Sequence, residues 1–269
     1  MTTRWFLVHV LLVVCAAGVA AAQSSYRSIT VPNGGSITGL VRFAGTPPSG
    51  LTEPVTKDGD YCGSVKASPR LLIGRDGAVK NAVVWIDRIA EGKRFPPGGA
   101  AVLRQRKCEY EPHVLLLRAG EEFDIVNDDP FLHNVHTYDL MSASRSMFNI
   151  AQPVRGARTK VNPDHVKGCG PIMATCDAGH PWMNAYIVRA PHPYYAVTDA
   201  AGRFRLDDVP PGTYTLTMWH EGVATHAVRA GAPPAVEEPY MQSKQVVIQP
   251  YGESTISFSL SLRTVSASK

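Results

Sequence analysis

Hydrophobic and polar residues alternate in short segments along most of the chain. Segments 36–43 (SITGLVRF) and 254–260 (STISFSL) alternate with a period of two, as half-buried strands do. Segment 81–87 (NAVVWID), a short apolar run, is also typical of a strand. After the N-terminal apolar run, no helix-period pattern lasts longer than two turns. Turns rich in the 23 glycines and 21 prolines separate the segments. The sequence therefore predicts an all-β protein of the sandwich type.

The same pattern predicts further strands in the middle of the chain. We expect a short strand at 71–73 and two strands at 108–117 and 122–127, with 139–170 as a long connection. A strand at 184–189 directly follows the segment 176–183.

The C-terminal part is rich in turns. Asp199 and Gly202 are expected to form a hairpin turn, and Pro210 to Gly212 the next one. Segments 244–248 and 254–260 supply two closing strands.

The N-terminus has the order of a secretory signal peptide. Arg4 precedes an apolar run, and Ala20 to Ala22 offer small residues before Gln23. We therefore expect residues 1–22 to be cleaved and the protein to be periplasmic or secreted. An uncleaved membrane anchor is the alternative, but the run is short for one, and no later stretch could span a bilayer.

Charge and motifs exclude several classes of function. The net charge is +4, and the basic residues are scattered, which argues against a nucleic-acid partner. The nucleophile elbow, the zinc-protease helix, the Walker loop and the dinucleotide glycine fingerprint are all missing. The sequence therefore predicts that the protein is not an enzyme.

One group of residues has the chemistry of a copper site. A mononuclear electron-transfer copper takes two imidazoles and a thiolate in a plane, with a weak axial thioether. His133 follows a strand and a turn, whereas Cys176, His180 and Met183 share a single loop directly before a strand. This layout makes the four residues candidate ligands of one type 1-like copper ion.

The segment 102–190 resembles the cupredoxins. Its stretch PHVLLLRAGEEFDIVNDDPFLHNVHTY is similar to the front half of plastocyanin and amicyanin, where a His-Asn-Val motif carries the first copper ligand. The block His180-Pro-Trp-Met183 is similar to the ligand loop of amicyanin. The resemblance implies a Greek-key sandwich with His133, Cys176, His180 and Met183 as ligands.

The ligand loop departs from the amicyanin pattern by one residue. Three residues, rather than two, separate Cys176 from His180. Gly179 could absorb the addition, because glycine takes backbone angles closed to other residues. Alternatively, the addition pulls the sulfur out of the ligand plane.

The cysteines leave a second alternative open. Cys62, Cys108, Cys169 and Cys176 follow the signal segment, and an even number in an oxidising compartment is typical of disulfides. A Cys169–Cys176 disulfide would remove the thiolate. The companion pair, Cys62 and Cys108, is interpreted as a structural disulfide.

A second resemblance flanks the first. The stretches TDAAGRF (198–204) and VPPGTYTL (209–216) are similar to the carboxypeptidase regulatory-like domain, a transthyretin-like sandwich. Its opening G-x-V and A-x-V strands match Gly39–Val41 and Ala82–Val84, which precede the cupredoxin-like segment. We therefore expect the segment 102–190 to be inserted between 36–101 and 191–262. The alternative is modules in series.

These observations leave several functions to compare. The first is an exported copper protein that passes single electrons to a redox partner protein. The second is a non-enzymatic surface or carbohydrate-binding module whose cupredoxin fold holds no metal, since such sandwiches share a shape with sugar-binding modules. The third is copper delivery or storage for a copper-handling partner, which would not require a strong Cys176 thiolate ligand.

Overall fold

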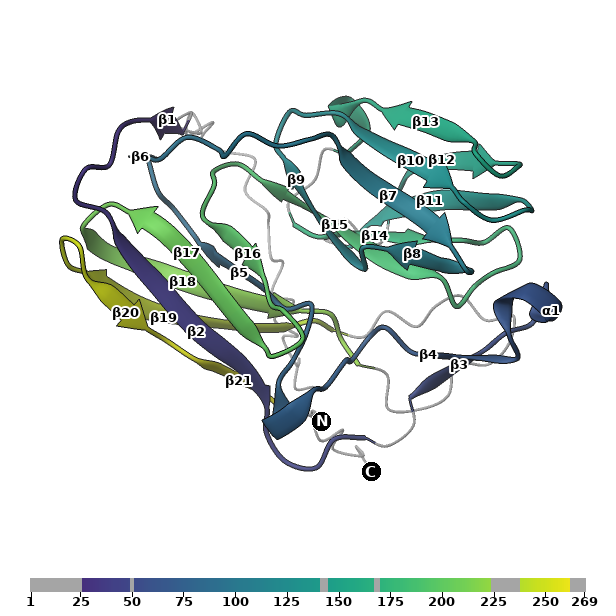
Figure 1. Cartoon of the computed structure of the whole chain (residues 1–269), viewed down its shortest axis with the longest axis horizontal. Helices are drawn as coiled ribbons and strands as arrows, with labels where there is room; N and C mark the ends of the chain where they lie inside the picture. The colour runs from purple at the N-terminus through teal and green to yellow at the C-terminus, as the bar shows by residue number, and fades with distance from the viewer. Residues whose placement is uncertain (1–25, 49–50, 141–144, 167–169, 224–237, 262–269) are drawn as a thin grey trace, which may run out of the picture.

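A computed structural model describes residues 26–48, 51–140, 145–166, 170–223 and 238–261 of the 269-residue chain (Figure 1). Nearly all regular structure in these residues is β, as predicted. The expected signal peptide, residues 1–22, lies outside them. Within the described part of the chain, no helix is both long and apolar enough to cross a membrane.

Two facing sheets are built from the middle of the chain. One has the order β13-β10-β7-β8 and the other β12-β11-β14-β15-β9. Their strands are β7 (Ala101–Arg106), β8 (Glu109–Glu111), β9 (Val114–Arg118), β10 (Phe123–Asn127), β11 (His133–Asp139), β12 (Arg145–Gln152), β13 (Arg158–Val161), β14 (Ile172–Thr175) and β15 (Asn184–Ala190). A short 3-10 helix, η2 (Pro163–Val166), follows β13.

Two further sheets combine strands from both ends of the described chain. One has the order β16-β5-β18-β19, and in the other β2 lies between β17 and β20 and also pairs with β21. The strands are β2 (Gly35–Phe43), β5 (Val83–Ile86), β16 (Tyr195–Val197), β17 (Arg203–Val209), β18 (Gly212–His220), β19 (Tyr240–Ile248), β20 (Glu253–Thr255) and β21 (Phe258–Leu260). In Figure 1 this purple, green and yellow sandwich lies to the left of the teal one.

Smaller elements complete the fold. β1 (Arg27–Ser28) pairs with β6 (Glu91–Gly92), and η1 (Arg75–Gly77) precedes β5. Between β2 and β5 the chain forms β3 (Thr52–Pro54), a single helical turn α1 (Gly59–Cys62) and β4 (Val65–Ala67). β3 and β4 pair with each other in an antiparallel ribbon.

Each sandwich has its own apolar core, and a third cluster joins them. β15 is buried on both faces: Ala185 and Ile187 face the core of the teal sandwich, whereas Tyr186 and Val188 pack with Trp219 of β18. Alternating side chains of a strand point to opposite faces, so one strand serves both contacts.

Several predicted elements were wrong in detail. The expected strand 108–117 is two strands in different sheets. Pro112, which lacks an amide hydrogen and cannot donate to a strand ladder, lies in the break between β8 and β9. Segment 71–73 is not a strand; only Ile73 makes an isolated bridge, with Val79. The connection 139–170 contains β12 and β13, whose residues are nearly all exposed or half-buried and lack a clear apolar alternation.

The two C-terminal turns are not hairpins. The Gly202 amide donates to the Asp199 carbonyl at 2.9 Å, so the predicted turn exists. However, β16 and β17 belong to different sheets, and so do β17 and β18. Both turns therefore lead from one layer of the sandwich to the other.

Candidate metal centre

His133 is the first residue of β11 and is placed by the turn before it. Asn127, at the end of β10, is fully buried and holds that turn together. Its Nδ2 donates to the carbonyls of Phe131 (2.8 Å) and Gln152 (2.9 Å), and its Oδ1 accepts from the Asp129 amide (2.9 Å). The turn therefore fixes where the buried His133 ring lies.

The loop between β14 and β15 supplies the other candidates. The Cys176 amide donates to the Met183 carbonyl at 3.3 Å, and the Met183 amide donates to the His180 carbonyl at 2.9 Å. Gly179 has a φ of +108°, an angle that side-chain-bearing residues rarely adopt. This angle is of the kind that the first of the two alternatives, absorption of the additional residue at Gly179, requires.

The ligand loop is also tied to β11 by side chains. Asn134 accepts the Ala178 amide at its Oδ1 (2.9 Å) and donates to the Asp177 carboxylate. The same carboxylate lies 2.6 Å from Nδ1 of His136, which therefore faces Asp177 and not the candidate ligands.

Three of the four predicted ligands point their donor atoms at one another. The Nδ1 atoms of His133 and His180 are 3.2 Å apart, and the Cys176 Sγ lies 3.7 Å and 3.8 Å from them. A point equidistant from the three atoms lies about 2.1 Å from each, which is a metal–imidazole bond length and slightly shorter than the roughly 2.3 Å of a zinc–thiolate bond. The three side chains are fully buried, so the arrangement fits a trigonal metal site.

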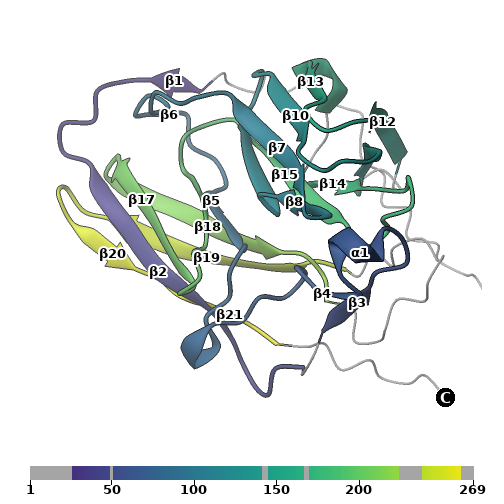
Figure 2. The same cartoon turned by 45° about the vertical axis from the view of Figure 1, so that its right-hand side comes forward.

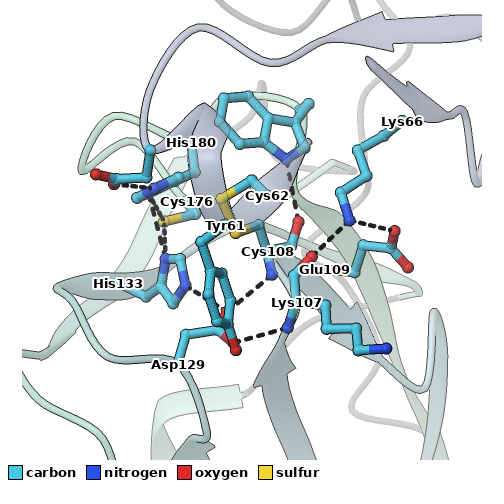
Figure 3. Close-up of a disulfide and its surroundings, with 12 residues drawn as sticks. Tyr61, Cys62, Lys66, Lys107, Cys108, Glu109, Asp129, His133, Cys176 and His180 are labelled. Atoms are coloured by element: carbon cyan, nitrogen blue, oxygen red, sulfur yellow. Dashed lines mark hydrogen bonds and ion pairs between the residues drawn. A yellow bond between two sulfur atoms is a disulfide. The ribbon is translucent and has the colours of Figure 1, made fainter. Parts of the chain in front are cut away.

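The outer nitrogens of both imidazoles are held by carboxylates. His133 Nε2 lies 2.9 Å from Asp129 Oδ2 (Figure 3). His180 Nε2 lies 2.8 Å from Asp58 Oδ2. Such contacts fix the ring and leave Nδ1 free to bind metal. Burial lowers the pKa of His180, assisted by the neighbouring His133, while Asp58 opposes the shift. His180 is therefore biased toward the neutral form that a ligand needs.

Asp129 is ionised despite its burial. Burial alone would raise its pKa, but hydrogen bonds from His133, Cys108, Lys107 and Tyr61 outweigh that effect and lower the pKa. The backbone amides of Lys107 and Cys108 donate at 2.7 Å and 2.8 Å, and the Tyr61 hydroxyl at 3.0 Å.

Cys176 is a free, buried thiol, and burial raises its pKa to about 11. Cys169, its predicted rival partner, lies outside the described residues. Cys62 and Cys108 form the predicted disulfide. Cys108 also lies near Asp129 and His133, but as half of a disulfide its sulfur is not available as a thiolate.

Met183 and Trp182 complete the surroundings of the site. Met183 is 1% exposed and packs in the same core cluster as Cys176, and its backbone closes the ligand loop. The Trp182 ring lies edge-on to His180 with centroids 5.2 Å apart, and its Nε1 donates to the Cys108 carbonyl at 3.0 Å. Phe131 stacks on His180 at 5.5 Å. Aromatic rings therefore exclude water from two sides.

Sequence reasoning did not find Lys57, Asp58 and Tyr61, which reach the site from the ribbon between β2 and β5. No periodic pattern or motif marks them. The signal that could have found them is the Cys62–Cys108 disulfide, because a bond to Cys108 brings the residues just before Cys62 next to the candidate ligands.

Comparison with protein families agrees with one of the two sequence resemblances. The family model of the carboxypeptidase regulatory-like domain matches residues 175–261. This match begins at the last residue of β14 and includes β15, although β15 pairs with β14 and β9 in the teal sandwich. No curated protein matches the chain.

The structural neighbours are copper proteins with partial overlap. An oxidised amicyanin variant is 18% identical, with 34% of this chain and 83% of amicyanin covered and a TM-score of 0.29. A reduced amicyanin variant is 19% identical, with 40% and 98% covered and a TM-score of 0.29. The copper-containing nitrite reductase of Thermus scotoductus SA-01 is 17% identical, with 39% of this chain and 25% of that chain covered and a TM-score of 0.27.

Proposed function

We propose that this is an exported cupredoxin-like protein that binds one copper ion at His133, Cys176 and His180, with Met183 as the axial ligand. Copper bound by two imidazoles and a thiolate would exchange single electrons with a redox partner protein. The observation that carries the proposal is the triangle of two Nδ1 atoms and one Sγ, with sides of 3.2 to 3.8 Å.

The surroundings of the triangle support a site for binding and not for catalysis. His133 and His180 are each held by a carboxylate, and all three donor side chains are fully buried. A rigid, dry site favours electron exchange because little has to rearrange, whereas a substrate would need an open coordination position. We therefore propose a non-enzymatic role.

Export and domain arrangement are part of the same proposal. A structural disulfide forms and persists in oxidising compartments, which together with the signal-like N-terminus supports a periplasmic or secreted location. The pairing of strands from 35–86 with strands from 195–260 supports an insertion of the cupredoxin-like domain, 102–190, into the regulatory-like sandwich.

The visible spectrum tests this function. The protein is expressed in an oxidising compartment, Cu(II) is added, and the spectrum is recorded beside a count of free thiols. We expect an intense thiolate-to-copper band that is absent from Cys176→Ala.

Two other results would contradict electron transfer. A colourless protein that retains no copper would favour the metal-free sandwich module. Copper that binds without the band, and still binds to Cys176→Ala, would indicate delivery or storage.

A further inference from the structure

The ribbon that carries Asp58 leaves its own sandwich and lies against the metal centre. Residues 52–67, comprising β3, α1 and β4, connect β2 to β5, two strands of the regulatory-like sandwich. Figures 1 and 2 both place α1 at the tip of this ribbon, beneath the teal sheets. We name residues 52–67 the cap.

The cap covers the ligand loop directly. Asp58 bonds to His180, and Lys57 Nζ donates to the Ala178 carbonyl at 3.2 Å. A β-carbon on Gly179 would lie 2.7 Å from Lys57 Cδ, so the lysine stem runs across the backbone of the loop. The face of the ligand loop that His180 would otherwise present to solvent is therefore closed, and His180 is fully buried.

A second set of contacts closes the His133 side. The Tyr61 hydroxyl donates to Asp129, which in turn holds His133 (Figure 3). The Tyr61 ring lies edge-on to Phe131, with centroids 5.4 Å apart. The cap thus reaches both histidines, each through one carboxylate.

The cap itself has almost no apolar anchor. Between Pro54 and Ala67, Cys62 is the only described residue that is buried, and it forms the disulfide with Cys108. Two further apolar contacts are peripheral: half-buried Val55 packs against the teal core, and the Tyr61 ring contacts Phe131. The remaining attachments are polar, such as Lys66 Nζ with the Lys107 carbonyl (2.6 Å) and with Glu109 (3.1 Å). Segments with few buried apolar contacts open locally at low cost unless a covalent bond holds them.

We propose that the cap is a closure over the metal centre and that the Cys62–Cys108 disulfide latches it. Metal ions and thiol reagents then reach Cys176 only when the cap lifts. The statement about metal ions rests on the proposed copper function, whereas the statement about Cys176 does not.

The test measures how fast Cys176 reacts with iodoacetamide in the metal-free protein. All variants carry Cys169→Ser, because Cys169 and Cys176 fall in one tryptic peptide between Lys167 and Arg189. Cys176 is then the single expected free thiol when the disulfide is intact. Adding Cys62→Ser and Cys108→Ser removes the latch, and we expect labelling to be at least about tenfold faster.

Global unfolding must be separated from lifting of the cap. The unfolding rate of each variant is measured in denaturant and extrapolated to water. The proposal requires that unlatched protein labels faster than it unfolds. Equal labelling rates with and without the latch would overturn it, and so would labelling that merely follows global unfolding.

A milder variant keeps the test decisive if the unlatched protein does not fold. Lys57→Ala with Tyr61→Phe, disulfide intact, removes two cap contacts and should accelerate labelling by a smaller factor. Lys160→Ala, which removes an exposed ion pair with Glu122 on the teal sandwich, is the matched control and should not change the rate. A variant rate equal to that control would then contradict the proposal.

Copper distinguishes this proposal from the proposed function. Extraction of Cu(II) by a chelator should be faster without the latch. If no variant binds copper but the labelling difference persists, the cap proposal holds and the copper function fails. Alternatively, copper binds and gives the thiolate band while the rates of labelling and extraction are the same with and without the disulfide. In that case the copper function holds and the cap proposal fails.

Discussion

Asp129 and His133 are joined by a 2.9 Å contact between two fully buried side chains. The carboxylate also accepts hydrogen bonds from two backbone amides and from the Tyr61 hydroxyl. A buried carboxylate with four donors is a structural anchor, because each donor would lose its partner if the carboxylate were removed.

Replacing this anchor should destabilise the protein strongly. In Asp129→Asn only one side-chain oxygen remains to accept from the four donors. The NH2 group that replaces the other oxygen is itself a donor and cannot accept a hydrogen bond from them. We expect the free energy of unfolding to fall by about 3 kcal/mol, measured by urea denaturation. Asp128→Asn is the matched control: its partner Arg104 is half exposed, so the loss should stay below about 1 kcal/mol. Equal losses would contradict the assigned role of Asp129.

The two sandwiches are joined by a buried contact between an imidazole and a carboxyl group. His113, before β9, contacts Glu221, after β18, and their side chains are 8% and 3% exposed. A double-mutant cycle with His113→Ala and Glu221→Ala should give a coupling energy of about 2 kcal/mol. The exposed pair Lys160 and Glu122 should give a coupling near zero. A negligible value for His113 and Glu221 would mean that the sandwiches do not depend on this contact.

The structure leaves no room for a side chain at Gly39, which lies in β2. This is the strand that carries the G-x-V motif similar to the regulatory-like domain. An added β-carbon would lie 1.7 Å from the Ile256 carbonyl oxygen and 2.6 Å from the Phe204 ring. Gly39→Ala should therefore cost about 3 kcal/mol or more of stability, because β2 must separate from a neighbour. Gly99→Ala, where an added β-carbon meets nothing within 4 Å, should be nearly neutral. Thermal unfolding of the two variants distinguishes a packing role from a general glycine effect.

His192 should make stability depend on pH. It is 4% exposed, and burial lowers its pKa from 6.5 to about 4. Between those values the unfolded chain binds a proton that the folded protein does not, so stability falls as the pH falls. The slope from this group is at most about 1.4 kcal/mol per pH unit.

A variant isolates that contribution. In His192→Phe the slope between about pH 6.5 and 4 should decrease by nearly this amount, measured by urea denaturation at several pH values. His165→Gln, at an exposed position in η2, should leave the slope unchanged. An unaltered slope in His192→Phe would show that other groups carry the acid sensitivity.

Much of the site was predictable because its residues belong to local patterns. His133 follows a strand and a turn, and Cys176, His180 and Met183 crowd one loop before a strand, so residue type and spacing were informative. In the folded protein the two imidazoles and the thiolate then lie together. The placement of Met183 as an axial ligand stays a prediction.

The remaining features depend on contacts between distant polar residues. Asp58 meets His180 across 122 positions, and nothing in the sequence around Asp58 distinguishes it from a solvated turn residue. β12 was missed because it is an edge strand, paired on one side only and mostly accessible to water, so it needs no apolar alternation. Pro112 indicated a break in the expected strand 108–117, but the apolar residues after it suggested that the strand continues.

The double burial of β15 has a consequence for dissecting the molecule. Met183 ends the ligand loop, and the strand that begins at the next residue presents Tyr186 and Val188 to Trp219 of the other sandwich. A fragment or graft limited to 101–190 would expose that apolar face and would also lack Lys57, Asp58 and Tyr61. The candidate metal centre is therefore not a transplantable module. A graft must also include, or redesign, the neighbouring sandwich against which its last strand packs.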